Sequence, residues 1–433
     1  MLPRSRYWTL AIVVALLVAG VVVYIIRAQA PVPSTVRGID WAGQGVWLRA
    51  ELHTHTRFSD GGHSVEEVVA AAAKNGCDAV AITDHTDDGL KAATPEYLAA
   101  IQAARAATPA VTVVTGVEWN VPPGKGQEHA GVLFPTEMEK VESLAPFKDR
   151  FDDWNKKGEN PELAREALAW LAKANAAGVA PVVMMNHPTR TPNSTSAPLL
   201  TFEALHRVAP SILTAVEGGP GHQRSTPLGS YKNPNLLVNR WDPIVAEVGG
   251  AWDTWLGKGL DVWGAAADAD FHGEAGDFQP CEFSSTWIYG PDRTPNGIIR
   301  ALRAGSYFGE QGHIAERVEL RVKADDQPSP IVPGQRLTAR AGTRLTVTLK
   351  VEVPATDYLG EPNRIDTVEL IGIANQKATV LFSGAPVGPE AFSVPVTVPP
   401  GGIVLRARGQ RGTDPQSALM FDTNPIRIST PSR

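Results

Sequence analysis

His53 and His55 are the residues whose type and spacing most directly suggest chemistry. They stand at the end of an apolar-rich run, Val46 to Leu52, that is typical of a β-strand. Side chains two positions apart in a strand point the same way, so both imidazoles face one side. Two imidazoles on one face form half of a metal site. Asp60, on the loop that follows, could fold a carboxylate back over them.

Further metal-ligating residue types follow other apolar runs of the chain. They are Asp84 and His85 after Ala79–Thr83, Glu118 after Val111–Val117, His187 after Val182–Met185, Glu217 after Ile212–Val216, and Asp270 and His272 after Val262–Ala267. The carboxyl ends of strands in a β/α barrel converge on one rim, where active sites form. We therefore expect these side chains to meet.

The elements between 46 and 312 alternate in type, as such a barrel requires. Ser64 and Glu67 form a capping box that starts a helix, and Gly76 ends it. An N-cap residue followed by proline opens four more predicted helices, at Thr94, Asn160, Asp242 and Thr294. This pattern predicts an α/β domain with a parallel sheet covered by helices.

After about Ile314 the pattern changes to short alternating runs separated by Pro and Gly. Such runs predict a C-terminal all-β sandwich, residues 313–433, with a structural or docking role.

The first thirty residues predict a membrane segment. Arg4 and Arg6 precede an uncharged run from Tyr7 to Ile26, which as a helix would reach about 30 Å. Ala28-Gln29-Ala30 resembles a cleavage site, so a removed signal peptide is the alternative to an uncleaved signal anchor. Either predicts an exported body, periplasmic or extracellular, anchored to the membrane or secreted. Residues 31–45 are predicted to be a linker.

Composition narrows the remaining classes. The chain has 433 residues, enough for two or three domains, and a net charge of -6, which argues against nucleic-acid binding. Its two cysteines, Cys77 and Cys281, are too few for a disulfide scaffold and are predicted to be structural thiols, although spacing alone leaves a bridge open.

Five motifs in order resemble the polymerase and histidinol phosphatase (PHP) superfamily. They are HxHxxxSDG from His53 to Gly61, TDH from Thr83 to His85, the strand-end Glu118, His187-Pro188, and DxH from Asp270 to His272. The resemblance covers residues 46–312 and implies a distorted (β/α)7 barrel that holds two or three divalent metals. The sandwich, with its phrase Phe421 to Ile426, resembles the carbaryl-hydrolase-like (CehA/McbA) branch.

The resemblance also implies a ligand set. His53, His55 and Asp270 would hold one metal, with Glu118 bridging to a second; His129 and His187 would complete that second site; Asp60, His85 and His272 would hold the third. His63 is the alternative to Asp60. Asp84 is expected behind the ligands, orienting an imidazole.

A mixed imidazole and carboxylate set suits Zn, Mn or Fe. A hydroxide bridging two metals is a good nucleophile near neutral pH, and a third metal can offset charge in the transition state. We therefore expect a phosphoesterase acting on a small-molecule ester, with Glu118, Asp270 and His272 as catalytic candidates. The alternatives are a carboxyl-ester or carbamate hydrolase using the same metals, and a non-catalytic cell-surface binding protein.

Several further residues have both a functional and a structural interpretation. Arg190 could clamp a phosphate or form a surface ion pair, and His222 and Arg224 could line the pocket rim or lie on a solvated loop. Glu217 could support the ligands from behind. His206 and His313 are predicted to be structural.

Overall fold

The computed structural model describes residues 34–123, 128–152, 160, 162–174, 180–190, 197–221, 224, 239–414 and 417–431. The predicted membrane segment, residues 1–30, lies outside these ranges. Within them, no helix combines the length and the apolar character needed to cross a bilayer.

A curled sheet forms the first part of the fold. Its strands are β2 (Val46–Glu51), β3 (Ala79–Ile82), β4 (Thr112–Asn120), β5 (His129–Leu133), β6 (Val182–Asn186), β7 (Leu213–Gly219), β8 (Trp263–Ala267), β9 (Ser284–Gly290) and β10 (Tyr307–Gln311). They neighbour one another in the order β10-β9-β2-β3-β4-β5-β6-β7-β8. The predicted α/β class is therefore confirmed, and the sheet curls as a PHP barrel requires.

The predicted parallel alternation is interrupted at two places. Strand β5 runs antiparallel to both β4 and β6. Strand β9 runs antiparallel to β2 and to β10. The connection from β4 to β5 has too few residues for a parallel crossover, which needs a dozen or more, so a hairpin forms instead.

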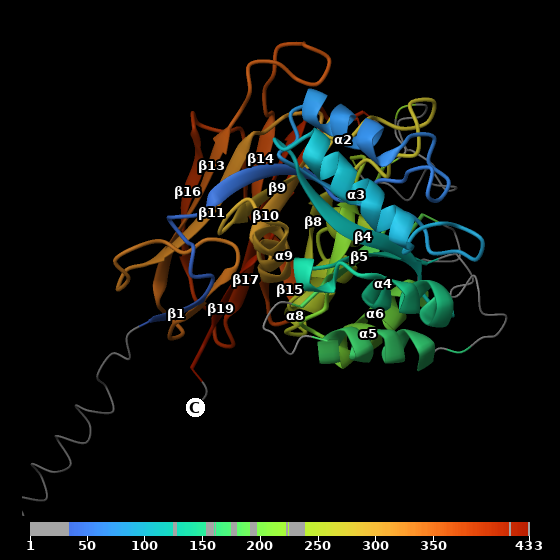
Figure 1. Ribbon diagram of the computed structural model, residues 1–433. Helices are drawn as coiled ribbons and strands as arrows, with labels where there is room; N and C mark the ends of the chain where they lie inside the picture. Colours follow the sequence, from blue (N-terminus) through green and yellow to red (C-terminus); the bar gives the residue numbers. More distant parts are fainter. Residues whose placement is uncertain are drawn as a thin grey trace, which may run out of the picture.

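Helices cover the outer face of the curled sheet (Figure 1). They are α2 (Val65–Lys74), α3 (Pro95–Ala107), α4 (Val141–Pro146), α5 (Glu162–Ala174), α6 (Ala197–Val208), α7 (Pro243–Ala246), α8 (Ala251–Gly257) and α9 (Pro295–Ala304), with short 3-10 and π turns at Thr136–Met138 and Phe147–Phe151. The capping box of Ser64 and Glu67 forms as predicted.

The helix predicted from Asp242 to near Gly257 is two helices. Helix α7 ends after one turn, and α8 begins after a break at 247–250. Gly249 adopts φ +86°, a left-handed conformation that glycine accepts readily and that interrupts a right-handed helix.

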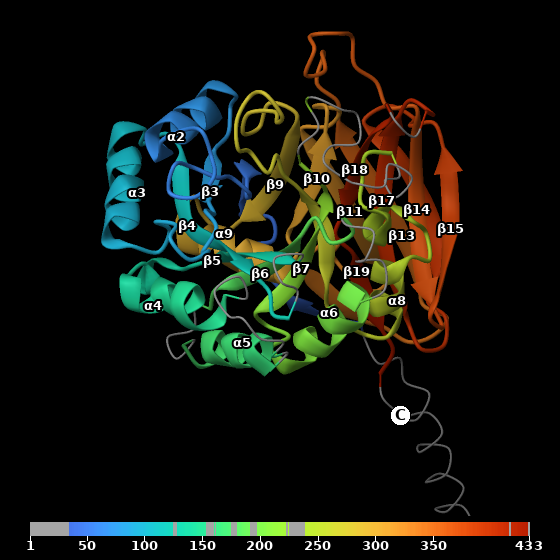
Figure 2. The ribbon, with the colours of Figure 1, turned by 90° about the vertical axis from the view of Figure 1, so that its right-hand side faces the viewer.

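The C-terminal region is β-rich, as predicted. Its strands are β11 (Arg317–Ala324), β12 (Gln335–Thr338), β13 (Arg344–Glu352), β14 (Thr367–Ala374), β15 (Lys377–Gly384), β16 (Glu390–Thr397), β17 (Ile403–Arg411), β18 (Leu419–Thr423) and β19 (Ile426–Ser429). Strands β11, β13 and β16 form a separate sheet, and apolar side chains of both sheets share one buried cluster. In Figure 2 these strands stand beside the curled sheet, on the side opposite the outer helices α3, α4 and α5.

The two parts of the chain share a sheet. Strand β10 pairs on one side with β9 and on the other with β18, so the curled sheet continues into the C-terminal strands. The prediction that residues 31–45 are only a linker is wrong in part, because Thr35–Gly38 forms β1 and pairs with β12. The segment before β2 therefore pairs with the C-terminal region, and only then does the chain enter the curled sheet.

Cys77 and Cys281 form a disulfide, which corrects the prediction of two separate thiols. Their Cα atoms lie 5.8 Å apart although 204 positions separate them in sequence. The bond joins the segment between α2 and β3 to the loop that follows β8. Spacing could not indicate it, because only the folded sheet brings these two segments together.

Loss of this disulfide should destabilise the protein. Replacing both residues, Cys77→Ser with Cys281→Ser, is expected to lower the free energy of unfolding by about 2–5 kcal/mol, because the unfolded chain regains a very long open loop. Urea unfolding would measure this. A reducing agent should destabilise the parent similarly and leave the variant unchanged; equal stability of parent and variant would contradict the bond.

Glu310, a buried carboxyl group on β10, makes the stability of the fold depend on pH. Burial raises the pKa of Glu310 on β10 to about 8, although Arg49 opposes the shift. Between its ordinary pKa and about 8, the folded protein keeps a proton that the unfolded chain has lost, so stability falls as pH rises, by at most about 1.4 kcal/mol per pH unit. Glu310→Gln should flatten this decline in urea unfolding, whereas the exposed Glu352→Gln should reproduce the parent's slope.

Candidate metal centre

The carboxyl ends of the barrel strands deliver the predicted ligands to one place. His53 and His55 follow β2, His85 follows β3, and Glu118 lies within β4. His129 opens β5, His187 follows β6, and Asp270 and His272 follow β8. A cavity of about 500 Å³ opens there; its lining includes Asp60, His85, Glu118, His129, Asp270 and His272.

The first group is His53, His55, Glu118 and Asp270, all fully or almost fully buried. The Nε2 atoms of His53 and His55 lie 3.2 Å apart, and each lies 3.1–3.2 Å from Asp270 Oδ1. Glu118 oxygens lie 3.1 Å and 3.2 Å from the same two nitrogens. Metal–nitrogen bonds of about 2.0–2.1 Å in a tetrahedron put neighbouring donors about 3.3 Å apart. The spacing therefore fits donors arranged around one ion.

Glu118 also lies at the centre of a second group, with His85, His129 and His187 around its carboxylate. Its Oε1 is 3.3 Å from His129 Nδ1 and 3.4 Å from His187 Nε2. Its Oε2 is 3.3 Å from His85 Nε2. The carboxylate thus faces the first group and this one together, which is the position that a bridging ligand needs.

The third group is His55, Asp60, His85 and His272. Asp60 Oδ2 lies 3.3 Å from His272 Nε2 and 3.9 Å from His85 Nε2. Asp60 Oδ1 lies 3.5 Å from His55 Nδ1, so His55 contacts two groups, which the sequence did not indicate. All nine predicted residues therefore lie in one contiguous cluster, and their role as metal ligands stays a prediction.

His63, the alternative to Asp60, lies outside the cluster. Its Nε2 is 2.8 Å from Glu274 Oε2, and its Nδ1 is 3.8 Å from Glu67 Oε2. It therefore ties the loop after His55 to helix α2 and to the loop that carries His272.

Asp84 lies behind the ligands, as expected, and reaches the imidazole of His55 through the loop that follows it. Its carboxylate accepts hydrogen bonds from the amide and hydroxyl of Thr56 and from Ser59 Oγ, at 2.6–2.8 Å. Ser59 Oγ in turn lies 3.4 Å from His55 Nδ1. Gly61 is required beside them, because a Cβ there would lie 2.4 Å from the backbone of His55.

Asn186 is a residue of the site that sequence reasoning missed. Its Nδ2 donates to Glu118 Oε1 at 2.8 Å and lies 3.3 Å from His53 Nε2. Its position at a strand end, next to His187, was the only available indication. Glu217 lies behind the ligands, as predicted: its Oε2 accepts from the His187 amide at 2.6 Å, and its Oε1 is 3.6 Å from His53 Nδ1.

Burial opposes protonation of His55, but hydrogen bonds with Asp270 and Glu118 raise its pKa to about 9, so the charge states within this cluster are mixed. Burial opposes ionisation of Glu118, but neighbouring imidazoles, that of His53 above all, hold its pKa well below the ordinary value. Burial lowers the pKa of His85 to about 3 and that of His187 well below its ordinary value. At pH 7 these two imidazoles are therefore neutral and offer a lone pair, as metal ligation requires.

Backbone conformation supports a functional role for two of the nine. His187 adopts φ +29° and Asp270 φ +47°, in the left-handed region that residues other than glycine rarely occupy. Such conformations persist where surrounding structure enforces them, and they cluster at functional sites.

The remaining candidates divide between the cavity and the surface. Arg190 lines the cavity, with Nη1 3.7 Å from Asp270 Oδ2. Arg224 pairs instead with Glu282 and stacks over Phe278, so it supports the loop after β8. His206 is buried against the Leu213 carbonyl, as its predicted structural role requires. His222 lies outside the described residues.

One family model matches part of this chain. Residues 51–183, less than half of the chain, match the family model of the PHP domain. Among curated proteins, none matches. With this domain, the buried His, Asp and Glu cluster fits a metal-dependent hydrolase that uses divalent ions.

Solved structures match this chain at low identity. A two-domain protein from Bacteroides vulgatus, containing a predicted PHP-like metal-dependent phosphoesterase, is 12% identical with a TM-score of 0.40, over 92% of this chain and 99% of its own. A protein from Bifidobacterium adolescentis, provisionally described as a metal-dependent phosphoesterase, is 14% identical with a TM-score of 0.31, over 52% of this chain and 87% of its own. An amidohydrolase from Chromobacterium violaceum, with bound sulfate and no metal, is 16% identical with a TM-score of 0.29 over the same shares. At these scores the likeness is loose.

Metal analysis can separate Asp60 from His63. Asp60→Asn should lower the metal bound per chain by about one ion, because Asp60 faces three imidazoles of the third group. His63→Ala should leave the metal content unchanged. Elemental analysis of the purified proteins measures both. Metal loss from His63→Ala but not from Asp60→Asn would assign the ligand to His63.

Proposed function

We propose that this protein is a metal-dependent phosphoesterase with a trinuclear site for Zn, Mn or Fe. The observation that carries the proposal is the position of Glu118, whose buried carboxylate lies 3.1–3.4 Å from the imidazoles of His53, His55, His85, His129 and His187. Bound divalent ions would supply an activated water and offset the charge of a phosphate group.

The side chains at the cavity mouth have distinct roles in this proposal. His272 and Asp60 are the most exposed of the nine and are the ones a substrate reaches first. Arg190, on the segment after β6, can donate to a phosphate oxygen from the side of Asp270. Asn186 and Glu217 act through their neighbours: they hold Glu118, His53 and the His187 backbone in place.

A carboxyl-ester or carbamate substrate is the second candidate, and one observation favours it. The cavity lining also includes Asp87 and Asp88, against the single cation Arg190 among the lining residues. Burial and the neighbouring Asp152 raise the pKa of Asp87 to about 6, so it is mostly ionised at neutral pH. An acidic rim disfavours an anionic substrate and favours a neutral ester.

We further infer that the body of the protein is exported. The Cys77–Cys281 disulfide supports this, because such bonds persist in oxidising compartments. The predicted N-terminal anchor points the same way. The assignment to the CehA/McbA branch is likewise a proposal, supported by the β-rich C-terminal region.

Paired substrates test the reaction class. With added Mn or Zn, the full-length protein should hydrolyse p-nitrophenyl phosphate faster than p-nitrophenyl acetate, and Glu118→Gln should lose about 100-fold or more of that activity because its bridging charge is gone. Release of p-nitrophenol reports both rates. His206→Ala, a buried imidazole outside the cluster, is the matched control.

Faster hydrolysis of p-nitrophenyl acetate than of p-nitrophenyl phosphate, lost to the same extent in Glu118→Gln, would establish the carboxyl-ester reaction. Activity that survives Glu118→Gln undiminished would exclude catalysis at this site. Absence of bound metal from the purified parent would favour the binding-protein alternative.

A further inference from the structure

Strands β2 and β8 each lead to two of the candidate ligands, yet in the described part of the chain no ladder pairs them with each other. Strand β8 is the last in the order of the curled sheet and pairs with β7, whereas β2 pairs with β3 and β9. His53 and His55 follow β2, and Asp270 and His272 follow β8. Contacts other than a strand ladder must therefore hold these two segments side by side.

A buried carboxylate reaches across this junction from each side. Glu51, the last residue of β2, accepts the Ala269 amide at 3.0 Å on both of its oxygens and the His53 amide at 3.1 Å. Asp268, directly after β8, accepts in the opposite direction, from the Leu52 amide at 2.9 Å. Both residues are fully buried. We call Glu51 and Asp268 together the carboxylate clamp.

The amides that the carboxylate clamp holds lie next to candidate ligands. Leu52 directly precedes His53, Ala269 directly precedes Asp270, and the third amide is that of His53 itself. Asp270 adopts φ +47°, a conformation that persists only where the surrounding structure enforces it. The carboxylate clamp therefore fixes the backbone immediately before this strained residue.

A short backbone contact continues from the carboxylate clamp toward the cavity. The Phe271 amide donates to the His53 carbonyl at 3.3 Å, and the His55 amide donates to the Phe271 carbonyl at 2.9 Å. Next to this contact, the Nε2 atoms of His53 and His55 lie 3.1 Å and 3.2 Å from Asp270 Oδ1. The register of the two segments, and with it the spacing of these three donors, is set where the segments first meet, at the carboxylate clamp.

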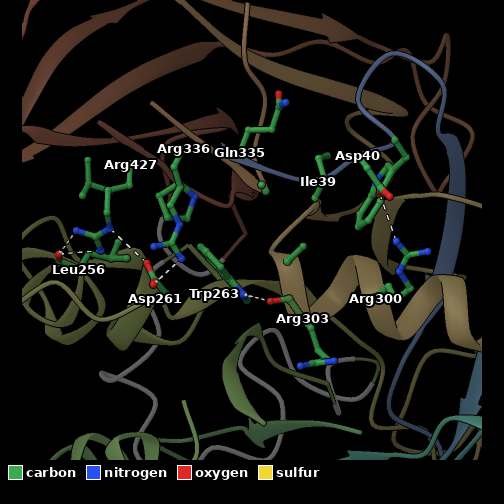
Figure 3. A pocket seen from close by; sticks show the side chains of 16 residues that line it. Ile39, Asp40, Leu256, Asp261, Trp263, Arg300, Arg303, Gln335, Arg336 and Arg427 are labelled. Carbon is green, nitrogen blue, oxygen red and sulfur yellow. Dashed lines mark hydrogen bonds and ion pairs between the residues drawn. The ribbon is translucent and has the colours of Figure 1, made fainter. Parts of the chain in front are cut away.

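Other contacts already anchor β8 at its amino end. Asp261, just before β8, pairs with Arg336 at 2.6 Å and with Arg427 at 3.3 Å (Figure 3). Trp263, the first residue of β8, donates through Nε1 to the Arg303 carbonyl at 2.9 Å. These contacts tie β8 to β12, β19 and α9. Two buried carboxylates at the opposite end would be a costly second anchor if they only held the strand.

We propose that Glu51 and Asp268 are positioning residues of the metal centre, which hold the segments after β2 and β8 at the spacing that one ion requires. Neither side chain belongs to the three ligand groups. Hydrogen bonds from amides to a carboxylate are short and strong, so they suit this task. The inference rests on the metal centre of the proposed function and is independent of the substrate class.

Cobalt(II) titration of the metal-free, full-length protein tests the carboxylate clamp, because the visible absorption of Co(II) reports both its binding and its coordination geometry. Glu51→Ala and Asp268→Ala remove the acceptor oxygens, so Co(II) should bind about 10–100-fold more weakly and with an altered spectrum. Glu51→Gln and Asp268→Asn each keep one acceptor oxygen, so they should recover most of the lost affinity and the parent's spectrum.

Glu310→Ala is the matched control for these variants. Glu310 is likewise a buried carboxyl group that accepts a backbone amide, that of Ile314 at 3.1 Å, but it belongs to none of the ligand groups. Urea unfolding of the metal-free proteins should show a lower midpoint for Glu310→Ala and for both alanine variants of the clamp. Only the clamp variants should lose Co(II) affinity, which separates positioning from a general loss of stability. Should Glu51→Ala not fold, Asp268→Ala supplies the same comparison.

The possible results separate this inference from the proposed function. A parent that binds Co(II), with folded alanine variants that bind it as tightly and give the same spectrum, would overturn the carboxylate clamp and leave the metal centre intact. Equal weakening in the alanine variants and in Glu51→Gln and Asp268→Asn would also overturn it, because negative charge and not an amide acceptor would then be decisive. A parent that binds no Co(II) would overturn the proposed function and the clamp together.

Discussion

Burial of the Glu118 carboxylate among five imidazoles is the constraint on which the rest of this structure depends. An ionised carboxylate removed from water is costly unless cations or hydrogen-bond donors surround it. Asn186 supplies one donor, and the imidazoles must be charged or shared with a metal to supply the rest. Each strand of the curled sheet that ends near Glu118 contributes a side chain that helps to surround this carboxylate. This shared requirement explains why the strand ends lie so close together. A bound divalent ion would balance the carboxylate charge with the fewest buried protons on the imidazoles.

Much of this arrangement could be predicted from sequence because it follows from local rules. Strand periodicity and caps located the elements, and polar residues at strand ends located most of the cluster. His129 was expected only from the resemblance to the PHP superfamily. Asn186 was not predicted, because an amide at a strand end has no distinctive spacing. The antiparallel direction of β5 was not predicted either, because it depends on the length of the connection from β4. Asp84 was expected to orient an imidazole, but the sequence does not show which one, because the fold of the loop brings Thr56 and Ser59 to its carboxylate.

Long-range pairings were beyond sequence reasoning for a different physical reason. The Cys77–Cys281 bond and the pairing of β1 with β12 join segments hundreds of positions apart. Neither leaves a local pattern, because each depends on where the whole sheet places two distant segments.

The pairing of β10 with both β9 and β18 limits how this protein can be divided. A chain stopped after β10 would expose the backbone amides and carbonyls of Phe308, Gly309 and Glu310 as a bare edge, next to apolar side chains that β18 normally covers. Such edges recruit other strands, so an isolated barrel would tend to self-associate. Exchange of the C-terminal region for another domain during evolution would expose the same edge. Any replacement domain would therefore have to offer a strand that pairs with β10.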